Sequence, residues 1–258
     1  MSQLGISFVV PTYNDCEAFA RTISSIAQQA DSLDQIIIVD SSDRAITSSQ
    51  IESLTKNRCE TKLIWTKPEG VYPAQNLGIE NCDRKFVQII NAGDLLLESC
   101  LAYIKQVIEQ HPGLDAYVFS QQTERGGVVV GRNVPTINSI WPHQSVIVSM
   151  EVYNRLGGYS ILHKFVSDQL FFCRMRNECR VHLDRKVVTQ YNLEGISSVV
   201  SCKLTQEVFE LRRTMGHSTL GAAFYALRPW LRLILTRTLG AHMVDVFRRL
   251  NTSSACDR

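Results

Sequence analysis

Several features are scarce in this 258-residue sequence, and each absence excludes a class of protein. None of its eight cysteines is spaced as Cys-x-x-Cys, which argues against a structural zinc site. No run of about 18 apolar residues occurs, so we expect no membrane span, and residues 1–8 lack the basic flank and apolar core of a targeting peptide. The net charge is only +2, so we expect no nucleic-acid partner.

The composition that remains is that of a globular protein, with 45% hydrophobic and 20% charged residues. This length suffices for one large core, or for one domain with an appendage. The scattered cysteines are typical of small buried hydrophobes in a cytoplasmic protein, so we expect a cytoplasmic location.

Strand-like and helix-like patterns alternate over the first 65 residues. Apolar runs at 6–10, 36–39 and 62–65 indicate strands, and segments with helical spacing separate them. Pro11 cannot donate to a ladder, so we expect the first strand to stop there. The alternation predicts an α/β fold, with a Rossmann-like, mostly parallel sheet flanked by helices. The glycine-rich dinucleotide fingerprint is absent, which argues against a nicotinamide-dependent enzyme.

Polar residues follow the first two of these strands. Thr12 and Asn14 can bond a base or a ribose, and Asp40 is an acceptor for a base N–H or a ribose hydroxyl. Turns favour the same amino acids for backbone reasons, so each cluster taken alone is better explained as a turn, and only their convergence with Asp94 favours a binding site.

Residues 85–97 bring a carboxylate to the same edge. Their apolar run predicts a buried strand that ends at Asn91, followed by Gly93 and Asp94. Open α/β sheets bind ligands just past the carboxyl ends of their strands. From Leu97 onward the apolar spacing is helical. We hypothesise that Asp94 holds a divalent metal bridging a nucleotide-sugar diphosphate; the alternative is a solvated residue that caps the following helix.

Three further polar residues are candidates in the middle of the chain. Asn76, on a short predicted helix, could face a sugar or phosphate, and His143 could contact an acceptor, although each is also typical of a structural role. Ser167 is a predicted cap, and Asp168 opens a helix as a candidate proton acceptor. The helix dipole favours its ionised form while burial would raise its pKa, and capping alone also explains it.

The second half changes character. A hairpin with a two-glycine turn is predicted at 124–132, and we expect this half to shape an acceptor site rather than to extend the parallel sheet. From Thr205 onward the chain is helical and basic, so we divide it into a domain of residues 1–200 and an amphipathic extension of residues 201–258. The extension could contact the inner face of the cell membrane peripherally, or pack on its own domain with solvated arginines. Its apolar stripe consists of Leu220, Phe224, Leu227 and Leu231.

The order and spacing of six motifs resemble the family 2 glycosyltransferases with the GT-A fold, over roughly residues 5–200. The similarity is strongest to the branch that makes colanic acid and related exopolysaccharides. The motifs are PTYN at 11–14, GVYPAQNLGI at 70–79, NAGD at 91–94, His143-Gln144, SDQLFFCR at 167–174 and EGISS at 194–198.

The resemblance implies an inverting enzyme of bacterial surface polysaccharide synthesis. It would move a sugar from a nucleotide-diphosphate-sugar donor to a hydroxyl of a glycan or lipid-linked acceptor, with Asp168 as general base and Mn²⁺ or Mg²⁺ at Asp94. The implied nucleotide-binding residues are Pro11, Thr12, Tyr13, Asn14, Asp40 and Asn76, and the implied substrate-binding residues are Asn91, Gly93 and His143.

Departures from the family pattern leave the donor open. Asn91 replaces the first acid of the usual Asp-x-Asp motif, Arg44 follows Asp43, and Pro73 stands where the family has an acid. A non-catalytic nucleotide-sugar-binding or scaffold protein is the alternative, and it would need neither Asp94 nor Asp168. A nucleotidyltransferase would carry a glycine-rich basic loop after the first strand, which this chain lacks.

Overall fold

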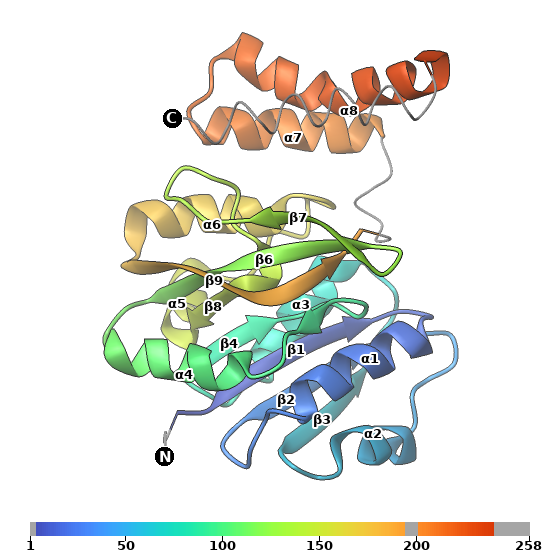
Figure 1. Ribbon diagram of the computed structural model, residues 1–258, viewed down its shortest axis with the longest axis vertical. Helices are drawn as coiled ribbons and strands as arrows, with labels where there is room; N and C mark the ends of the chain where they lie inside the picture. The colour runs from blue at the N-terminus through green and yellow to red at the C-terminus, as the bar shows by residue number, and fades with distance from the viewer. Residues whose placement is uncertain (1–3, 194–200, 240–258) are drawn as a thin grey trace. The chain divides into compact units, whose positions relative to one another are not determined.

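A computed structural model describes residues 4–193 and 201–239, and the chain divides into two compact units, residues 1–195 and 196–258. The predicted domain boundary at residue 200 lies outside the described residues. In the first unit, helices cover a large sheet (Figure 1). Its strands are β1 (Ile6–Thr12), β2 (Gln35–Asp40), β3 (Glu60–Trp65), β4 (Phe86–Ile89), β5 (Leu95–Leu96), β6 (Ala116–Arg125), β7 (Val128–Asn133), β8 (Val146–Ser149) and β9 (Val181–Asn192).

The helices of this unit lie on both faces of the sheet, over two separate apolar clusters. One cluster packs under α1, α2 and α4, and the other under α3, α5 and α6. The helices are α1 (Cys16–Ala27), α2 (Ser48–Thr55), α3 (Val71–Glu80), α4 (Cys100–Gln110), α5 (Met150–Leu156) and α6 (Ser167–Glu178), with a short 3-10 turn, η1 (His143–Ser145).

The strand order is β3-β2-β1-β4-β8-β6-β9-β5, so β1 lies inside the sheet between β2 and β4. β7 pairs with β6 outside this order. The first four strands are parallel, and Thr12, Asp40 and Trp65 form one register row at their carboxyl ends. The predicted α/β fold with a helix-flanked sheet is confirmed. The predicted two-glycine turn is also confirmed, because Gly126 and Gly127 both have positive φ, at 58° and 80°.

The second half was expected to shape an acceptor site rather than to extend the parallel sheet; it does extend the sheet, but it joins the parallel strands through antiparallel pairs. β8 joins the edge of β4 antiparallel, β6 pairs with β8, and β9 runs parallel to β6. The reason is that apolar residues of these strands are buried on both faces; Tyr117 and Val118, for example, are both 0% exposed. Such runs need covering helices on each side and therefore lie inside a sheet.

Element boundaries differ from the prediction in three places. β1 continues through Pro11 because its ladder with β4 ends at Val9, so the missing N–H removes no strand bond. Leu97 precedes α4, which begins at Cys100, because a short strand, β5, pairs with β9 first. α6 begins at Ser167 itself, whose hydroxyl therefore makes no cap bond.

The second unit contains α7 (Cys202–Thr214) and α8 (Thr219–Leu239), which pack against each other. The Trp230 Nε1–H donates to Thr205 Oγ1 at 2.7 Å, and the Arg212 guanidinium lies 4.2 Å from the centre of the Tyr225 ring. Nowhere in the described part of the chain is a helix both long and apolar enough to cross a bilayer.

Candidate active site

The loops that follow β1 and β2 are joined by side-chain hydrogen bonds. Asn14 Nδ2 donates to Asp43 Oδ2 at 2.9 Å, and the Asp43 N–H donates back to Asn14 Oδ1 at 3.0 Å. The Asn14 N–H also donates to Ser42 Oγ at 2.8 Å. Asn14 has a φ of 50°, a left-handed conformation that asparagine tolerates better than most residues. The two polar clusters predicted from sequence therefore meet at one edge of the sheet.

The members of these clusters differ in exposure. Pro11 and Thr12 are buried, whereas the Tyr13 side chain is 52% exposed. Asp40 is buried, and its two oxygens accept bonds from the N–H groups of Ser42 and Ile46 at 2.9 and 2.8 Å. Asp40 thus fixes the loop that carries Ser42 rather than pointing to solvent.

Asp94 lies in a turn that is anchored to α1. Its N–H donates to the Asn91 carbonyl at 3.0 Å, and Gly93 adopts a φ of 102°, which favours glycine. Thr22 of α1 holds both sides of this turn: its hydroxyl accepts from the Gly93 N–H at 2.9 Å and donates to the Asp94 carbonyl at 2.8 Å.

The Asp94 carboxylate is buried and does not cap α4, whose N-cap residue is Ser99. Gln144 Nε2 donates to Oδ2 at 2.6 Å, and the Asn192 N–H donates to Oδ1 at 2.9 Å. Burial raises the pKa of Asp94 to about 7, although these two donors lower it in part.

Gln144 is itself held by two other glutamines. Gln121 Nε2 donates to its side-chain oxygen, and Gln88 Nε2 donates to its main-chain carbonyl, both at 2.8 Å. These bonds orient the Gln144 amide so that its NH₂ group faces Asp94. The position of the Asp94 carboxylate is therefore set by β4, β6 and η1 together.

Asp168 is buried at the start of α6, where three donors surround its carboxylate. Tyr72 Oη donates to Oδ1 at 2.8 Å, while His143 Nδ1 lies 3.2 Å and Gln169 Nε2 2.9 Å from Oδ2. Burial alone would raise the pKa of Asp168, but His143 and the other donors outweigh it, so the pKa is lowered. The carboxylate is therefore ionised at neutral pH.

The neighbouring residues His143 and Gln144 connect the two acids. His143 bonds Asp168, and Gln144 bonds Asp94, so one turn contacts both carboxylates. Residues 94 and 168 are far apart in the sequence, yet they lie on either side of this turn. Both were predicted as site residues, and the structure brings them together.

Asn76 fixes the main chain of Tyr159, whose ring packs near two of the Asp168 partners. Its amide makes two bonds of 2.8 Å with the main chain of Tyr159, one as donor and one as acceptor. The Tyr159 ring in turn lies 5.6 Å from the Tyr72 ring and 5.7 Å from the His143 ring, between ring centres. Asn91 accepts a 2.9 Å bond from Gln75 Nε2, at the end of β4.

The donor set near Asp94 suits a hard cation that binds mainly to a substrate. Each Asp94 oxygen accepts one hydrogen bond and has a further lone pair, and Asn91 adds an amide oxygen nearby in the chain. Within residues 4–193 and 201–239, no three His, Cys, Asp or Glu side chains cluster as a preformed metal cage. Mg²⁺ commonly binds through one or two carboxylates, with substrate phosphates and water as its other ligands, so the residues fit such an ion.

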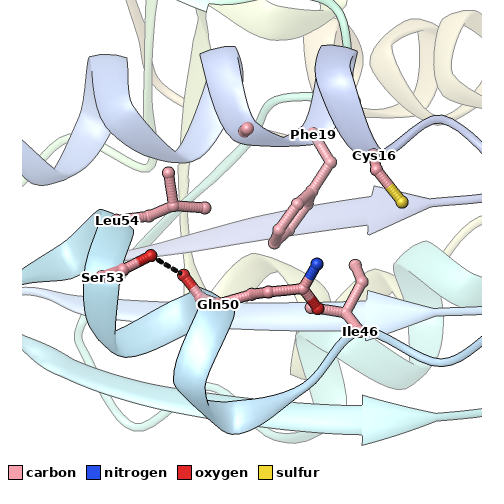
Figure 2. A pocket seen from close by; sticks show the side chains of 7 residues that line it. Cys16, Phe19, Ile46, Gln50, Ser53 and Leu54 are labelled. Atoms are coloured by element: carbon pink, nitrogen blue, oxygen red, sulfur yellow. Dashed lines mark hydrogen bonds between the residues drawn. The ribbon is translucent and has the colours of Figure 1, made fainter.

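A small pocket lies apart from these acids, between α1 and α2 (Figure 2). Its volume is about 150 Å³, and its apolar lining residues include Phe19, Ile46 and Leu54. Ligand pockets usually measure about 300–1,000 Å³, so this gap is too small for a nucleotide-sugar. It is best explained as imperfect packing between the two helices.

Sequence reasoning missed several residues that shape the site. Tyr72, Thr22 and the glutamines 75, 88 and 121 are all buried and all bond to it, directly or through one neighbour. The available signal was a polar residue on an otherwise apolar helix or strand, such as Gln88 within the run FVQII.

The fold is similar to that of solved glycosyltransferases. S. aureus TarS residues 1–349 in complex with UDP-GlcNAc matches with a TM-score of 0.66 at 16% identity, covering 88% of this chain and 72% of that one. Mannosyltransferase PcManGT from Pyrobaculum calidifontis, in complex with GDP-Man and Mn²⁺, matches with a TM-score of 0.63 at 15% identity, covering 98% and 81%. A further S. aureus TarS structure matches with a TM-score of 0.63 at 17% identity over 90% of this chain, which spans only 44% of that protein. At these identities the likeness shows the GT-A fold.

A search of curated proteins found no match to the chain. The model of the family described as Glycosyl transferase family 2, in contrast, matches residues 7–171. This stretch is more than half of the chain and contains all of β1 except Ile6, the Asp94 turn, His143-Gln144 and Asp168. The chain therefore belongs to glycosyl transferase family 2.

Proposed function

We propose that this chain transfers a sugar, with inversion, from a nucleotide-diphosphate-sugar donor to a hydroxyl of a glycan or lipid-linked acceptor. The observation that carries the proposal is the turn of His143 and Gln144, in which His143 contacts the Asp168 carboxylate and Gln144 contacts the Asp94 carboxylate. A chain that only bound nucleotide-sugars would need no second buried, ionised carboxylate beside the first. Membership of the family and the similar folds support the same reaction class.

The donor nucleotide is proposed to bind at the joined loops after β1 and β2. Tyr13 and Asn14 present an aromatic ring and an amide at the carboxyl edge of parallel strands, where such sheets bind nucleotides, and the buried Ser42 hydroxyl holds the Asn14 main chain. Asp40 would contribute to this site indirectly, because its carboxylate accepts from the Ser42 and Ile46 N–H groups and so fixes the loop after β2. UDP-GlcNAc and GDP-Man in the similar structures support a nucleotide-sugar as the ligand class.

Asp94 is the residue proposed to hold Mn²⁺ or Mg²⁺, with Asn91 and Gly93 in the same turn beside the donor. Such an ion would supply charge neutralisation for the departing diphosphate, which then needs no proton. Gln144 and Thr22 fix the turn in place, so their part is to position Asp94. The complex of PcManGT with GDP-Man and Mn²⁺ supports a divalent ion.

Asp168 is proposed as the general base. An acceptor hydroxyl oxygen forms a bond to the anomeric carbon as the bond from that carbon to the diphosphate oxygen breaks on the opposite face, and the hydroxyl proton moves to Asp168. His143, Tyr72 and Gln169 keep the carboxylate ionised before this step. Attack from the opposite face gives inversion.

The wider setting is proposed from the resemblance and from α8. Surface or exopolysaccharide synthesis of the colanic-acid type, in the bacterial cytoplasm, would use a lipid-linked acceptor at the inner face of the membrane. α8 carries an exposed apolar stripe, including Leu220 and Phe224 at 85% and 60% exposure, that could contact such a surface.

Replacing the proposed base tests the reaction. We expect Asp168→Asn to lower donor turnover by a factor of about 100 to 10,000, because an amide cannot accept the proton. Purified protein is incubated with Mn²⁺ and a panel of UDP-, GDP- and dTDP-sugars, and release of nucleoside diphosphate is measured. Donor binding, followed by calorimetry, should change less than threefold.

Asp184→Asn is a matched control, because the Asp184 carboxylate also accepts a hydrogen bond from a tyrosine, Tyr103, while its other oxygen accepts from the Lys186 N–H and not from a site residue. It should leave turnover unchanged. Full turnover in Asp168→Asn would remove Asp168 from the mechanism. Donor binding without any turnover by the unmodified chain would favour the non-catalytic nucleotide-sugar-binding or scaffold alternative.

A further inference from the structure

Two aromatic side chains stand out by their exposure. Within residues 4–193, Tyr13 and Trp65 are the only aromatic side chains more than half exposed, at 52% and 56%. The other tryptophan of this range, Trp141, is completely buried. Leaving a large aromatic ring in water is costly, because burying one contributes about 1.5–3 kcal/mol. Two such rings within one part of the fold therefore call for an explanation.

Both rings belong to the carboxyl edge of the parallel strands. Trp65 is the last residue of β3 and lies in one register row with Asp40 and Thr12, and Tyr13 follows Thr12 directly. Neighbouring strands are about 4.8 Å apart, so the two aromatic residues are separated by only two strand spacings. Their positions place them on either side of the end of β2.

Ser42 connects the two aromatic positions. The Trp65 Nε1–H donates to the Ser42 carbonyl at 3.3 Å, which holds the indole against the loop after β2. The Asn14 N–H, immediately after Tyr13, donates to the Ser42 hydroxyl at 2.8 Å. Two hydrogen bonds to one buried serine thus fix the loop of Tyr13 and the ring of Trp65 relative to each other.

We propose that Trp65 is a nucleobase-binding residue, whose indole stacks on the base of the donor on the side away from Tyr13. The inference rests on the proposed function, since it assigns a further residue to the donor site. A flat, weakly hydrated ligand explains why both rings are exposed here, and stacking on an aromatic side chain suits every base. β3 is also an edge strand, so a second protein copy could cover Trp65 instead, and the experiment separates the two.

Substitution of Trp65 tests the assignment through binding. We expect Trp65→Ala to weaken the best-bound of UDP, GDP and dTDP by about 5- to 150-fold in the presence of Mg²⁺, the range that loss of one stacking partner gives. Trp65→Phe should restore affinity to within about threefold of the unmodified chain, because a ring remains. Inorganic pyrophosphate, which has no base, should bind both variants as it binds the unmodified protein.

Fluorescence gives a second readout of the same contact. The chain has three tryptophans, so nucleotide-induced quenching in the unmodified protein that disappears in Trp65→Phe would place the base at this ring. Leu63→Ala is the matched control, because Leu63 is exposed two residues earlier on the same strand, and it should leave affinity and quenching unchanged. Thermal unfolding of each variant checks that it is folded.

The outcomes separate this inference from the proposed function. Nucleotide affinity in Trp65→Ala within twofold of the unmodified chain overturns the inference alone and leaves the donor site standing. A lower molecular mass in solution for that variant, with unchanged affinity, assigns Trp65 to an interface between copies and also overturns it. An unmodified chain that binds none of the three nucleotides overturns the proposed function and the inference with it.

Discussion

Two aspartates of the same site have opposite electrostatic settings. Asp94 is deeply buried, and its two neutral donors offset only part of that effect, so its pKa rises to about 7. Asp168 has the His143 ring, an amide and a phenol on its oxygens, so its pKa falls below the ordinary value. The difference suits the proposed roles, because a base must be ionised before it acts, whereas a ligand of a cation can become ionised when the cation arrives.

These opposite shifts predict opposite pH dependences of stability. The raised pKa of Asp94 gives a stabilisation that is complete below pH 3.8 and is lost as pH rises through about 7. The shift is about three pKa units, so about 4 kcal/mol of unfolding free energy is at stake as an upper figure. Asp94→Asn removes this titration, so its stability relative to the unmodified chain should rise from pH 4.5 to about 7 and level off above that pH.

Urea unfolding at pH 4.5, 6 and 8 measures the difference in unfolding free energy between Asp94→Asn and the unmodified chain. The readout is the change of this difference with pH, because Asn also loses one hydrogen bond at every pH. Asp168→Asn is the internal comparison. The lowered pKa of Asp168 stabilises the fold above pH 3.8 and ceases to do so as pH falls through the lower folded value, so this variant should be destabilised at neutral pH. A flat difference for Asp94→Asn between pH 4.5 and 8 would contradict the burial argument.

At the scale of elements, α1 contacts the site edge and α4 fixes the opposite, amino end of β1, both from one face of the sheet. Thr22 of α1 bonds the Asp94 turn, and Lys105 of α4 forms a buried ion pair with Asp34 at 2.8 Å. Asp34 also accepts from the Ile6 N–H at 3.0 Å, at the start of β1. Together these bonds tie the helices to the strand that carries the PTYN loop.

The exposed apolar stripe of α8 predicts binding to an anionic membrane surface. Full-length protein should bind vesicles containing anionic phospholipid, and the double change Leu220→Asp with Phe224→Asp should lower that binding at least tenfold, since each buried apolar side chain contributes about 1.5–3 kcal/mol. Vesicle flotation is the measurement. Leu162→Asp, at a residue 80% exposed in the first unit, is the control and should have no effect. Equal binding by the double variant would assign this face of α8 to another use.

At the scale of the whole molecule, sequence patterns sufficed where a residue's own neighbours decide its structure. Unbroken β-branched runs such as Ile36–Val39 predicted buried strands, and the two glycines at 126 and 127 predicted the hairpin. Order along the chain then placed Asn14, Asp40 and Asp94 near one sheet edge. These predictions needed only local chemistry and the rule that parallel strands end together.

Pairings between distant segments could not be predicted in this way. Nothing near Asp94 in the sequence reveals Gln144 or the Asn192 N–H, and nothing near Asp168 reveals Tyr72. The sign of the Asp168 pKa shift depended on these partners, since burial and hydrogen bonding oppose each other there. The position of β8 beside β4 likewise followed from tertiary packing, which an apolar run alone does not specify.

The most direct test of the proposed donor site is calorimetric titration of UDP-GlcNAc and of GDP-Man into the purified chain, with Mn²⁺ and with EDTA, for the unmodified protein and for Asp94→Ala. We predict that at least one donor binds ten or more times more tightly with Mn²⁺, because one carboxylate and the diphosphate share the ion. Asp94→Ala should lose that gain while remaining folded. Equal affinity in EDTA, or a metal-dependent gain that survives in Asp94→Ala, would contradict the assignment of Asp94 and with it the proposed arrangement of the site.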